Sequence, residues 1–199
     1  MHKDEVISIF RQANAILEGH FVLSSGRHSP VFLQKARVFM YPELTERLCK
    51  GLAQAIRAAG HEIDLVVSPA LGGLIPGYET ARHLGVPAIW VEREDGEFQL
   101  RRGFEIEPGA RIAIVEDIVT TGLSSREAVD CVKGLGGDVR CCACLIDRSA
   151  GKADPGVEMV ALAAMDVPSY ASDEIPPDLA AIPATKPGSR HLSAVKQAG

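Results

Sequence analysis

Apolar and polar positions along the chain form blocks that predict helices and strands in alternation. Apolar residues recur at helical spacing in four segments: Val6 to Leu17, closed by Gly19; Pro42 to Gly60; Tyr78 to Leu84; and Ala128 to Leu135. Short apolar runs predict strands at residues 65–67, 87–91, 112–115, 139–146 and 158–162. Because strands alternate with helices, the pattern favours an α/β fold with a doubly wound, mainly parallel sheet.

Three segments fall outside this alternation. Residues 21–33 hold two strand-like runs joined by a turn at Gly26, which predicts a β-hairpin. With the first helix it would form an N-terminal helix-hairpin unit over residues 1–40. Residues 92–103 carry charges and glycine without an apolar pattern, so we expect a mobile surface loop, with a solvated β-hairpin as the alternative. The proline-containing tail, residues 169–199, predicts an irregular wrap or a partly disordered end.

Length and composition fit one folded domain over residues 1–199. The chain has 46% apolar residues, enough to bury a continuous core. Its formal charge of −5 argues against nucleic acid as the main partner, since a phosphate backbone requires a basic face. No apolar run approaches the ~20 residues that span a bilayer, so we expect a cytoplasmic protein that does not associate with membranes.

Five cysteines include Cys141, Cys142 and Cys144 within one predicted strand. Cys141 and Cys144 have the C-x-x-C spacing of some metal and redox sites. Successive residues of a strand point to opposite faces, so Cys141 should point away from Cys142 and Cys144. One metal ion cannot collect all three, and we interpret them as small buried residues of a protein from a reducing compartment.

The strongest candidate chemistry lies at the end of the strand before Glu116. Glu116 and Asp117 are followed by a loop of small hydroxyl residues around Gly122, which leads into a helix expected to begin at Ser124 or Ser125. Backbone N–H groups of such a loop can surround a phosphate at the helix N-terminus. The same pattern also occurs in purely structural connections. Two adjacent carboxylates beside a phosphate favour a ligand that carries both phosphate and ribose.

Residues 116–124, Glu-Asp-Ile-Val-Thr-Thr-Gly-Leu-Ser, closely resemble the phosphoribosyl pyrophosphate (PRPP) motif of the type I phosphoribosyltransferases. The resemblance implies the fold of that family, with Glu116 and Asp117 as catalytic acids that hold the 2- and 3-hydroxyls of the ribose. It also implies a loop for the 5-phosphate, made of Ile118, Val119, Thr120, Thr121, Gly122, Leu123 and Ser124.

A narrower resemblance involves the predicted hairpin. Residues 23–33, Leu-Ser-Ser-Gly-Arg-His-Ser-Pro-Val-Phe-Leu, are similar to a segment that covers the base in orotate phosphoribosyltransferases. This implies that Phe32 and Leu33 line a flat pyrimidine pocket, together with Thr120. Arg148 matches an arginine of those proteins that pairs with the orotate carboxylate, and a guanidinium fork suits a planar carboxylate.

The loop Pro69-Ala-Leu-Gly-Gly looks like the pyrophosphate loop of the family. Leu71, Gly72 and Gly73 would then bind pyrophosphate, because glycines after a strand let the backbone approach an anion closely. A plain glycine turn is the alternative. The resemblance also implies Mg²⁺ as cofactor, held mainly through PRPP with no direct protein ligand.

Residues 92–103 correspond in the family to a flexible hood that closes over PRPP. The resemblance implies that Arg93 is catalytic there, with Arg101 and Arg102 as weaker candidates. It further implies a homodimer in which the hood of one subunit completes the site of its neighbour.

The reaction implied by both resemblances is transfer of the phosphoribosyl group from PRPP to orotate, with release of pyrophosphate and formation of orotidine 5-monophosphate, a step of pyrimidine biosynthesis. A purine or xanthine phosphoribosyltransferase and a non-catalytic PRPP-binding regulator are the alternatives. The hairpin and Arg148 favour orotate. A dinucleotide-binding protein is disfavoured, because the glycine fingerprint is missing from the first strand-helix turn.

The sequence departs from the family at several cations. Lysines common in the family are replaced by Ser24 in the hairpin and by Gly72 in the pyrophosphate loop. The hood lacks the usual lysines and histidine between Glu92 and Gly103. Lys35, just past the hairpin, and the hood arginines are the candidates to replace these charges.

Overall fold

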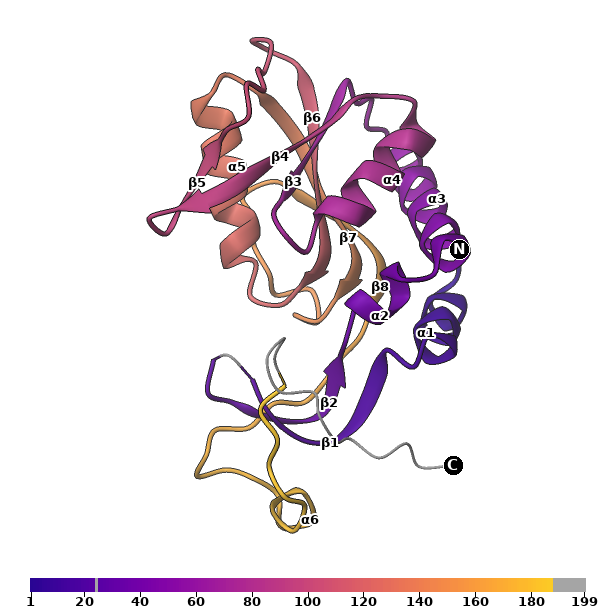
Figure 1. Cartoon of the computed structure of the whole chain (residues 1–199), viewed down its shortest axis with the longest axis vertical. Helices are drawn as coiled ribbons and strands as arrows, with labels where there is room; N and C mark the ends of the chain where they lie inside the picture. The colour runs from indigo at the N-terminus through magenta and orange to yellow at the C-terminus, as the bar shows by residue number, and fades with distance from the viewer. Residues whose placement is uncertain (24, 188–199) are drawn as a thin grey trace.

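The structure of the chain, a computed structural model, describes residues 1–23 and 25–187 (Figure 1). Along the chain the elements are α1 (Lys3–Gln12), β1 (Ile16–Val22), β2 (His28–Leu33), α2 (Ala36–Phe39), α3 (Pro42–Ala58), β3 (Leu65–Pro69), α4 (Leu74–Leu84), β4 (Ala88–Glu94), β5 (Glu97–Leu100), β6 (Arg111–Val119), α5 (Leu123–Gly134), β7 (Asp138–Asp147), β8 (Glu158–Ala164) and α6 (Pro177–Ala180).

A six-stranded sheet with the order β5-β4-β3-β6-β7-β8 forms the centre of the fold. Its strands are parallel except for β5, which pairs antiparallel with β4. β1 and β2 form a separate antiparallel hairpin, which Figure 1 shows below the sheet. The predicted α/β fold with a doubly wound, mainly parallel sheet and an N-terminal helix-hairpin unit is confirmed.

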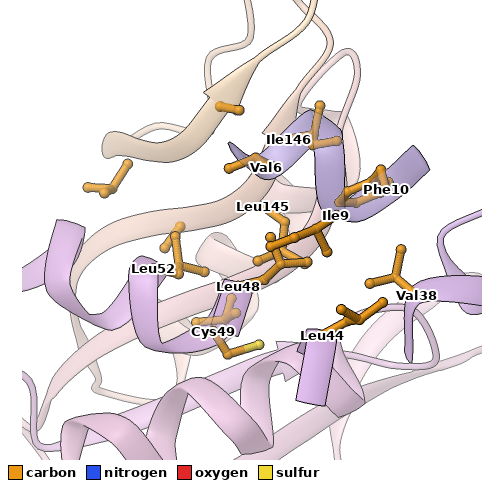
Figure 2. Packing of buried hydrophobic residues seen from close by; sticks show 14 of the residues in the cluster. Val6, Ile9, Phe10, Val38, Leu44, Leu48, Cys49, Leu52, Leu145 and Ile146 are labelled. Carbon is orange, nitrogen blue, oxygen red and sulfur yellow. The ribbon is translucent and has the colours of Figure 1, made fainter. Parts of the chain in front are cut away.

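Alternate residues of the central strand build a core on each face of the sheet. Ala113 and Val115 of β6 face the core shared with α1, α3 and α4, whereas Ile112 and Ile114 face α5. In Figure 2, apolar side chains of α1 converge with those of α3 around Leu48. Close packing on both faces holds the carboxyl end of β6 in one position.

Cysteines on β7 belong to these two cores. Cys141 packs on the side of α3 and Cys142 on the side of α5, and both are free thiols. Burial raises the pKa of each thiol to about 12, so they stay uncharged at neutral pH. The two side chains point to opposite faces, as the sequence predicted.

The first helix is shorter than the periodicity predicts. α1 ends at Gln12, and Asn14 then turns the chain in a left-handed conformation with a φ of 49°. Ile16 and Leu17 begin β1, and Gly19 lies at a bulge of the hairpin instead of a helix end. The predicted continuation of this helix to Leu17 is therefore wrong.

The hood segment, residues 92–103, contains a β-hairpin. β4 continues to Glu94, and β5 returns after a two-residue turn in which Asp95 and Gly96 have φ values of 51° and 92°. Turns with positive φ at both positions match the twist of antiparallel strands, and Asp-Gly favours them. The solvated hairpin, expected only as the alternative, therefore describes this segment up to Leu100.

The described part of the tail wraps around the N-terminal hairpin. Tyr170 forms a bridge with His28, and Thr185 forms one with Phe21, with α6 between them in sequence. The sequence predicts an irregular wrap or a partly disordered end here; up to residue 187 the tail holds the short α6 and these two bridges, and residues 188–199 lie outside the described residues. In the described ranges, no helix combines the length and apolarity needed to cross a membrane.

Candidate active site

Two buried acids lie at the carboxyl end of β6. Glu116 and Asp117 belong to the strand itself, which is longer than predicted and continues to Val119. Their exposed fractions are 8% and 1%. The N–H of Ile118 donates to Asp117 Oδ1 at 2.6 Å, and Lys35 Nζ lies 2.5 Å from Asp117 Oδ2. The Asp117 carboxylate is therefore held in a defined orientation.

Glu116 is a weak acid in this environment. Burial and the neighbouring Asp117 charge together raise its pKa to about 8, although Lys35, Ser125 and Arg93 act in the opposite direction. At neutral pH the Glu116 carboxyl is mostly protonated and can donate a hydrogen bond as well as accept one.

The raised pKa predicts that the protein loses stability as the pH rises from about 4.5 to 8. The unfolded chain releases this proton near 4.5, whereas the folded chain keeps it until about 8, so the folded state binds more protons in this window. Glu116→Gln should flatten the dependence of the thermal unfolding midpoint on pH over this range. Glu105→Gln, at an exposed position, should keep the wild-type curve. Parallel curves for the wild type and Glu116→Gln would contradict the assignment.

The loop after β6 depends on a glycine. Gly122 has a φ of 80°, and a Cβ there would lie 3.1 Å from the Cβ of Ala153. α5 begins at the next residue, Leu123, slightly earlier than predicted. Thr120 and Thr121 are exposed in front of this helix N-terminus. The loop presents hydroxyls and backbone N–H groups in a geometry that suits a phosphate.

The loop after β3 lies against the acids. A Cβ on Gly72 would overlap the Asp117 carboxylate and would lie 3.0 Å from Lys35 Nζ. Gly73 is packed against backbone carbonyls, and Leu71 is 83% exposed. Leu71, Gly72, Lys35 and Asp117 line one cavity of about 640 Å³, called here the loop cavity. The structure thus brings the two predicted loops together around Asp117.

A second cavity, of about 500 Å³, lies between the N-terminal hairpin and the ends of β6 and β7. It is called here the hairpin cavity. Its walls include Phe32, Leu33, Thr120 and Arg148, all of which the family resemblance of the sequence implied for a base pocket. Lys35 lines both cavities. The predicted base-pocket residues therefore share one space next to the acids.

Arg148 is the polar group of the hairpin cavity best suited to bind an anion. Its Nε is buried and finds no hydrogen-bond partner within the described ranges. Burial also lowers the pKa of its guanidinium. A buried cationic group without an acceptor is unfavourable, so a ligand carboxylate at this position would satisfy it.

The hood arginines are engaged away from both cavities in the described structure. Arg93 pairs with Glu127 and lies over the Phe98 ring at 4.2 Å. Arg101 and Arg102 pair with acids of β4. Within the described residues of one chain, Arg93 acts on Glu116 through its charge, but no ion pair joins these three arginines to Glu116 or Asp117.

The hairpin cavity also includes Leu23, Ser25 and Arg27, which belong to the segment 23–33 that resembles a base-covering segment. Val167 and Ser169 line it too, and these two residues carry no recognised sequence signal. Arg27 Nε donates to Ser169 Oγ at 2.9 Å, which ties the tail to the hairpin and completes the cavity wall. Because the two residues are far apart in sequence, no local pattern could reveal their contact.

The acids offer oxygen atoms that suit a magnesium ion. Hard cations prefer carboxylate, hydroxyl and phosphate oxygens, and Mg²⁺ commonly takes few protein ligands when a phosphate substrate supplies the others. Elsewhere in the described structure, three side chains of metal-ligating type come together: Glu46, Glu79 and His83. Arg82 bonds to both glutamates of that group, so a cation is already present there.

Comparisons with known proteins agree with these features. Residues 41–163 match the family described as phosphoribosyl transferase domain. The chain is 66% identical to orotate phosphoribosyltransferase 2 of Mesorhizobium japonicum and 64% identical to orotate phosphoribosyltransferase of Brucella canis, over 96% of this chain and 100% of each relative. The crystal structure of orotate phosphoribosyltransferase from Aeropyrum pernix matches with a TM-score of 0.71 and 26% identity, over 80% of this chain and 93% of that one. The chain therefore belongs to the phosphoribosyltransferase family and, within it, to the orotate phosphoribosyltransferases.

Proposed function

We propose that this chain transfers the phosphoribosyl group of PRPP to orotate, releases pyrophosphate and forms orotidine 5-monophosphate in pyrimidine biosynthesis. The observation that carries the proposal is the hairpin cavity, where the buried Nε of Arg148 shares one space with Phe32 and Leu33. A flat base fits an apolar wall, and its carboxylate fits the guanidinium. The relatives named orotate phosphoribosyltransferase support orotate over a purine.

Glu116 and Asp117 hold the ribose hydroxyls in this mechanism. The bond from C1 to a pyrophosphate oxygen breaks, and pyrophosphate leaves with the electron pair. N1 of orotate then bonds to C1 through its electron pair, and its proton passes to the released pyrophosphate. The transition state of such glycosyl transfers carries positive charge on the ribose. The Asp117 carboxylate stabilises that charge, and Glu116, which is mostly protonated, orients a hydroxyl.

The two loops beside the acids bind the phosphates. The 5-phosphate lies at residues 118–124, where the N-terminus of α5 favours an anion. The pyrophosphate lies in the loop cavity at residues 71–73. A magnesium ion bound with PRPP would neutralise part of the pyrophosphate charge, and the side chains of Glu116 and Asp117 would face it.

An absorbance assay tests the proposal directly. The purified protein is mixed with PRPP and magnesium chloride, and the loss of orotate absorbance is followed, with adenine, guanine, xanthine and uracil as control bases. We expect turnover with orotate to exceed turnover with every control base by a wide margin. Turnover with a purine and none with orotate would overturn the assignment.

We also propose that the protein works in the cytoplasm. Its five cysteines are all free thiols, which supports a reducing compartment. Cell fractionation should recover the phosphoribosyltransferase activity in the cytoplasmic fraction, and recovery in an exported fraction would contradict this placement.

We propose that the active form is a homodimer. Large apolar side chains that are exposed in the single chain border the site; this apolar face consists of Met40, Leu71, Ile75 and Tyr78, together with Tyr41, which follows Met40 in the chain. Exposed apolar surface of this kind marks protein interfaces. Leu71 and Ile75 also line the loop cavity, so a second copy on this face would border the site. The hood hairpin of that copy could then bring Arg93 to the bound PRPP.

Charged substitutions on the apolar face should separate the two subunits. Ile75→Glu and Tyr78→Glu place a carboxylate in an apolar contact, and we expect sedimentation to show monomers with reduced turnover. Leu135→Glu, at an exposed position after α5, should leave the dimer and the activity intact. A wild-type monomer, or dimers in both variants of the apolar face, would exclude this interface.

A further inference from the structure

The fold fixes the starting point of the Lys35 side chain. Lys35 follows β2, and its carbonyl oxygen accepts the N–H of Val38 at 2.9 Å in the turn that leads through α2. The N–H of the preceding Gln34 donates to the carbonyl oxygen of Ala15 at 2.7 Å. The backbone of this lysine is thus tied both to the chain before β1 and to the next helix.

The Lys35 ammonium lies where the ribose site and the pyrophosphate site meet. Nζ is 2.5 Å from Asp117 Oδ2, and it lies 3.0 Å from the position that a Cβ on Gly72 would take. The side chain of Lys35 is 39% exposed, whereas that of Asp117 is 2% exposed. The lysine therefore has open space on the cavity side, while the carboxylate is enclosed.

The space beside Gly72 accounts for one departure from the family. A side chain at residue 72 would overlap the Asp117 carboxylate and press on Lys35 Nζ. Residue 72 and Lys35 therefore compete for the same volume. In this chain Lys35, just after β2, supplies the positively charged group in that volume, and the loop after β3 supplies none there.

Within the described ranges, Lys35 is also the only cation among the residues that line the loop cavity. Arg27 is bonded to Ser169, and Arg93 is paired with Glu127. Arg148 lines the hairpin cavity and not the loop cavity. A pyrophosphate bound at Gly72 would therefore meet Lys35 before any other basic side chain of its own chain.

We propose, resting on the function proposed above, that Lys35 is a catalytic residue that changes partner: it pairs with Asp117 in the free protein and binds the pyrophosphate of PRPP in the complex. The exchange frees Asp117 Oδ2 to accept a ribose hydroxyl, so binding of pyrophosphate and binding of ribose support each other. An ammonium on a flexible stem, with three donors, suits an anion with many oxygens. It also stabilises the charge of the leaving group.

Calorimetric titrations with three ligands test this exchange. Lys35→Met should weaken the binding of pyrophosphate and of PRPP by about a hundredfold, because one charge-assisted contact is lost. Orotidine 5-monophosphate has the ribose, the 5-phosphate and the base but no pyrophosphate, so its affinity should not fall and should rise to the extent that Lys35 occupies Asp117 Oδ2 in the wild type. Lys35→Arg should recover part of the loss, and Lys50→Met, at an exposed position of α3, should bind all three ligands like the wild type.

Other results of these titrations would contradict the proposal. An equal loss of affinity for orotidine 5-monophosphate would mean that Lys35 only orients Asp117, and unchanged pyrophosphate affinity would mean that it contacts no pyrophosphate. If Lys35→Met does not fold because Asp117 is left as an unpaired buried charge, Asp117→Asn with and without Lys35→Met gives the same comparison. If the wild type converts orotate and substitution of Lys35 changes no affinity, the inference on Lys35 is refuted while the proposed function stands. If the wild type does not convert orotate, the proposed function itself is refuted.

Discussion

Asp117→Asn should lower kcat/KM for PRPP by about a hundredfold to a thousandfold, because the neutral amide no longer stabilises positive charge on the ribose in the transition state. The substitution keeps the shape of the side chain at a position that is 1% exposed. It removes the buried charge, while its partner Lys35 can turn to solvent. We therefore expect a large loss of turnover with a small change in the thermal unfolding midpoint.

Steady-state kinetics at saturating orotate, combined with thermal unfolding, measure both effects. Asp130→Asn, at an exposed position of α5, should behave like the wild type in both measurements. Unchanged kcat/KM in a folded Asp117→Asn protein would mean that this carboxylate does not act on the ribose. A collapse of stability without a kinetic effect in the remaining folded fraction would make Asp117 a structural residue.

Arg148→Met should reduce kcat/KM for orotate by roughly a hundredfold or more and should reduce the preference for orotate over uracil. Uracil lacks the carboxylate, so the guanidinium contributes to orotate binding only. The folded protein should be at least as stable as the wild type, since the variant removes a half-buried cation whose buried Nε has no partner within the described ranges. Lost activity together with retained or increased stability is the expected signature of a group placed for a ligand.

Competition assays with orotate and uracil give the ratio of the two kcat/KM values. Arg148→Lys keeps the charge without the planar fork and should fall between the wild type and Arg148→Met. Arg140→Met, on β7, which ends just before Arg148, but paired with Asp138 at the surface, should leave the ratio unchanged. An unaltered ratio in Arg148→Met would remove this residue from the base site.

Local sequence was sufficient for features that depend on residues close together in the chain. The apolar run before Glu116, the hydroxyl loop and Gly122 predict a strand, a loop and a helix N-terminus, and the structure contains them in that order. The error at the first helix had a local signal of its own, because Asn14 adopts the left-handed conformation that ends a helix. Asp95-Gly96 is likewise a typical two-residue hairpin turn, and it favours the hairpin alternative for residues 92–103.

Contacts between distant segments required the tertiary structure. The wall of the hairpin cavity combines Arg27 with Ser169 of the tail, and Arg93 turns to Glu127 of α5 instead of the acids. The contact of Lys35 with Asp117 is another contact between distant segments. This closeness follows from how the hairpin docks on the sheet, and no spacing along the chain encodes it.

The sequence by itself determined the α/β alternation, the acids and loop at the end of β6, and the family to which the chain belongs, because each depends on short-range pattern or on a contiguous motif. Only the tertiary structure determined which charged side chains are paired and which are buried. It placed an ammonium against Asp117, enclosed Glu116 so that its pKa rises to about 8, and left Arg148 Nε without a described partner. Burial and pairing of charges depend on which distant surfaces meet, and that is settled only when the hairpin, the tail and the sheet pack together.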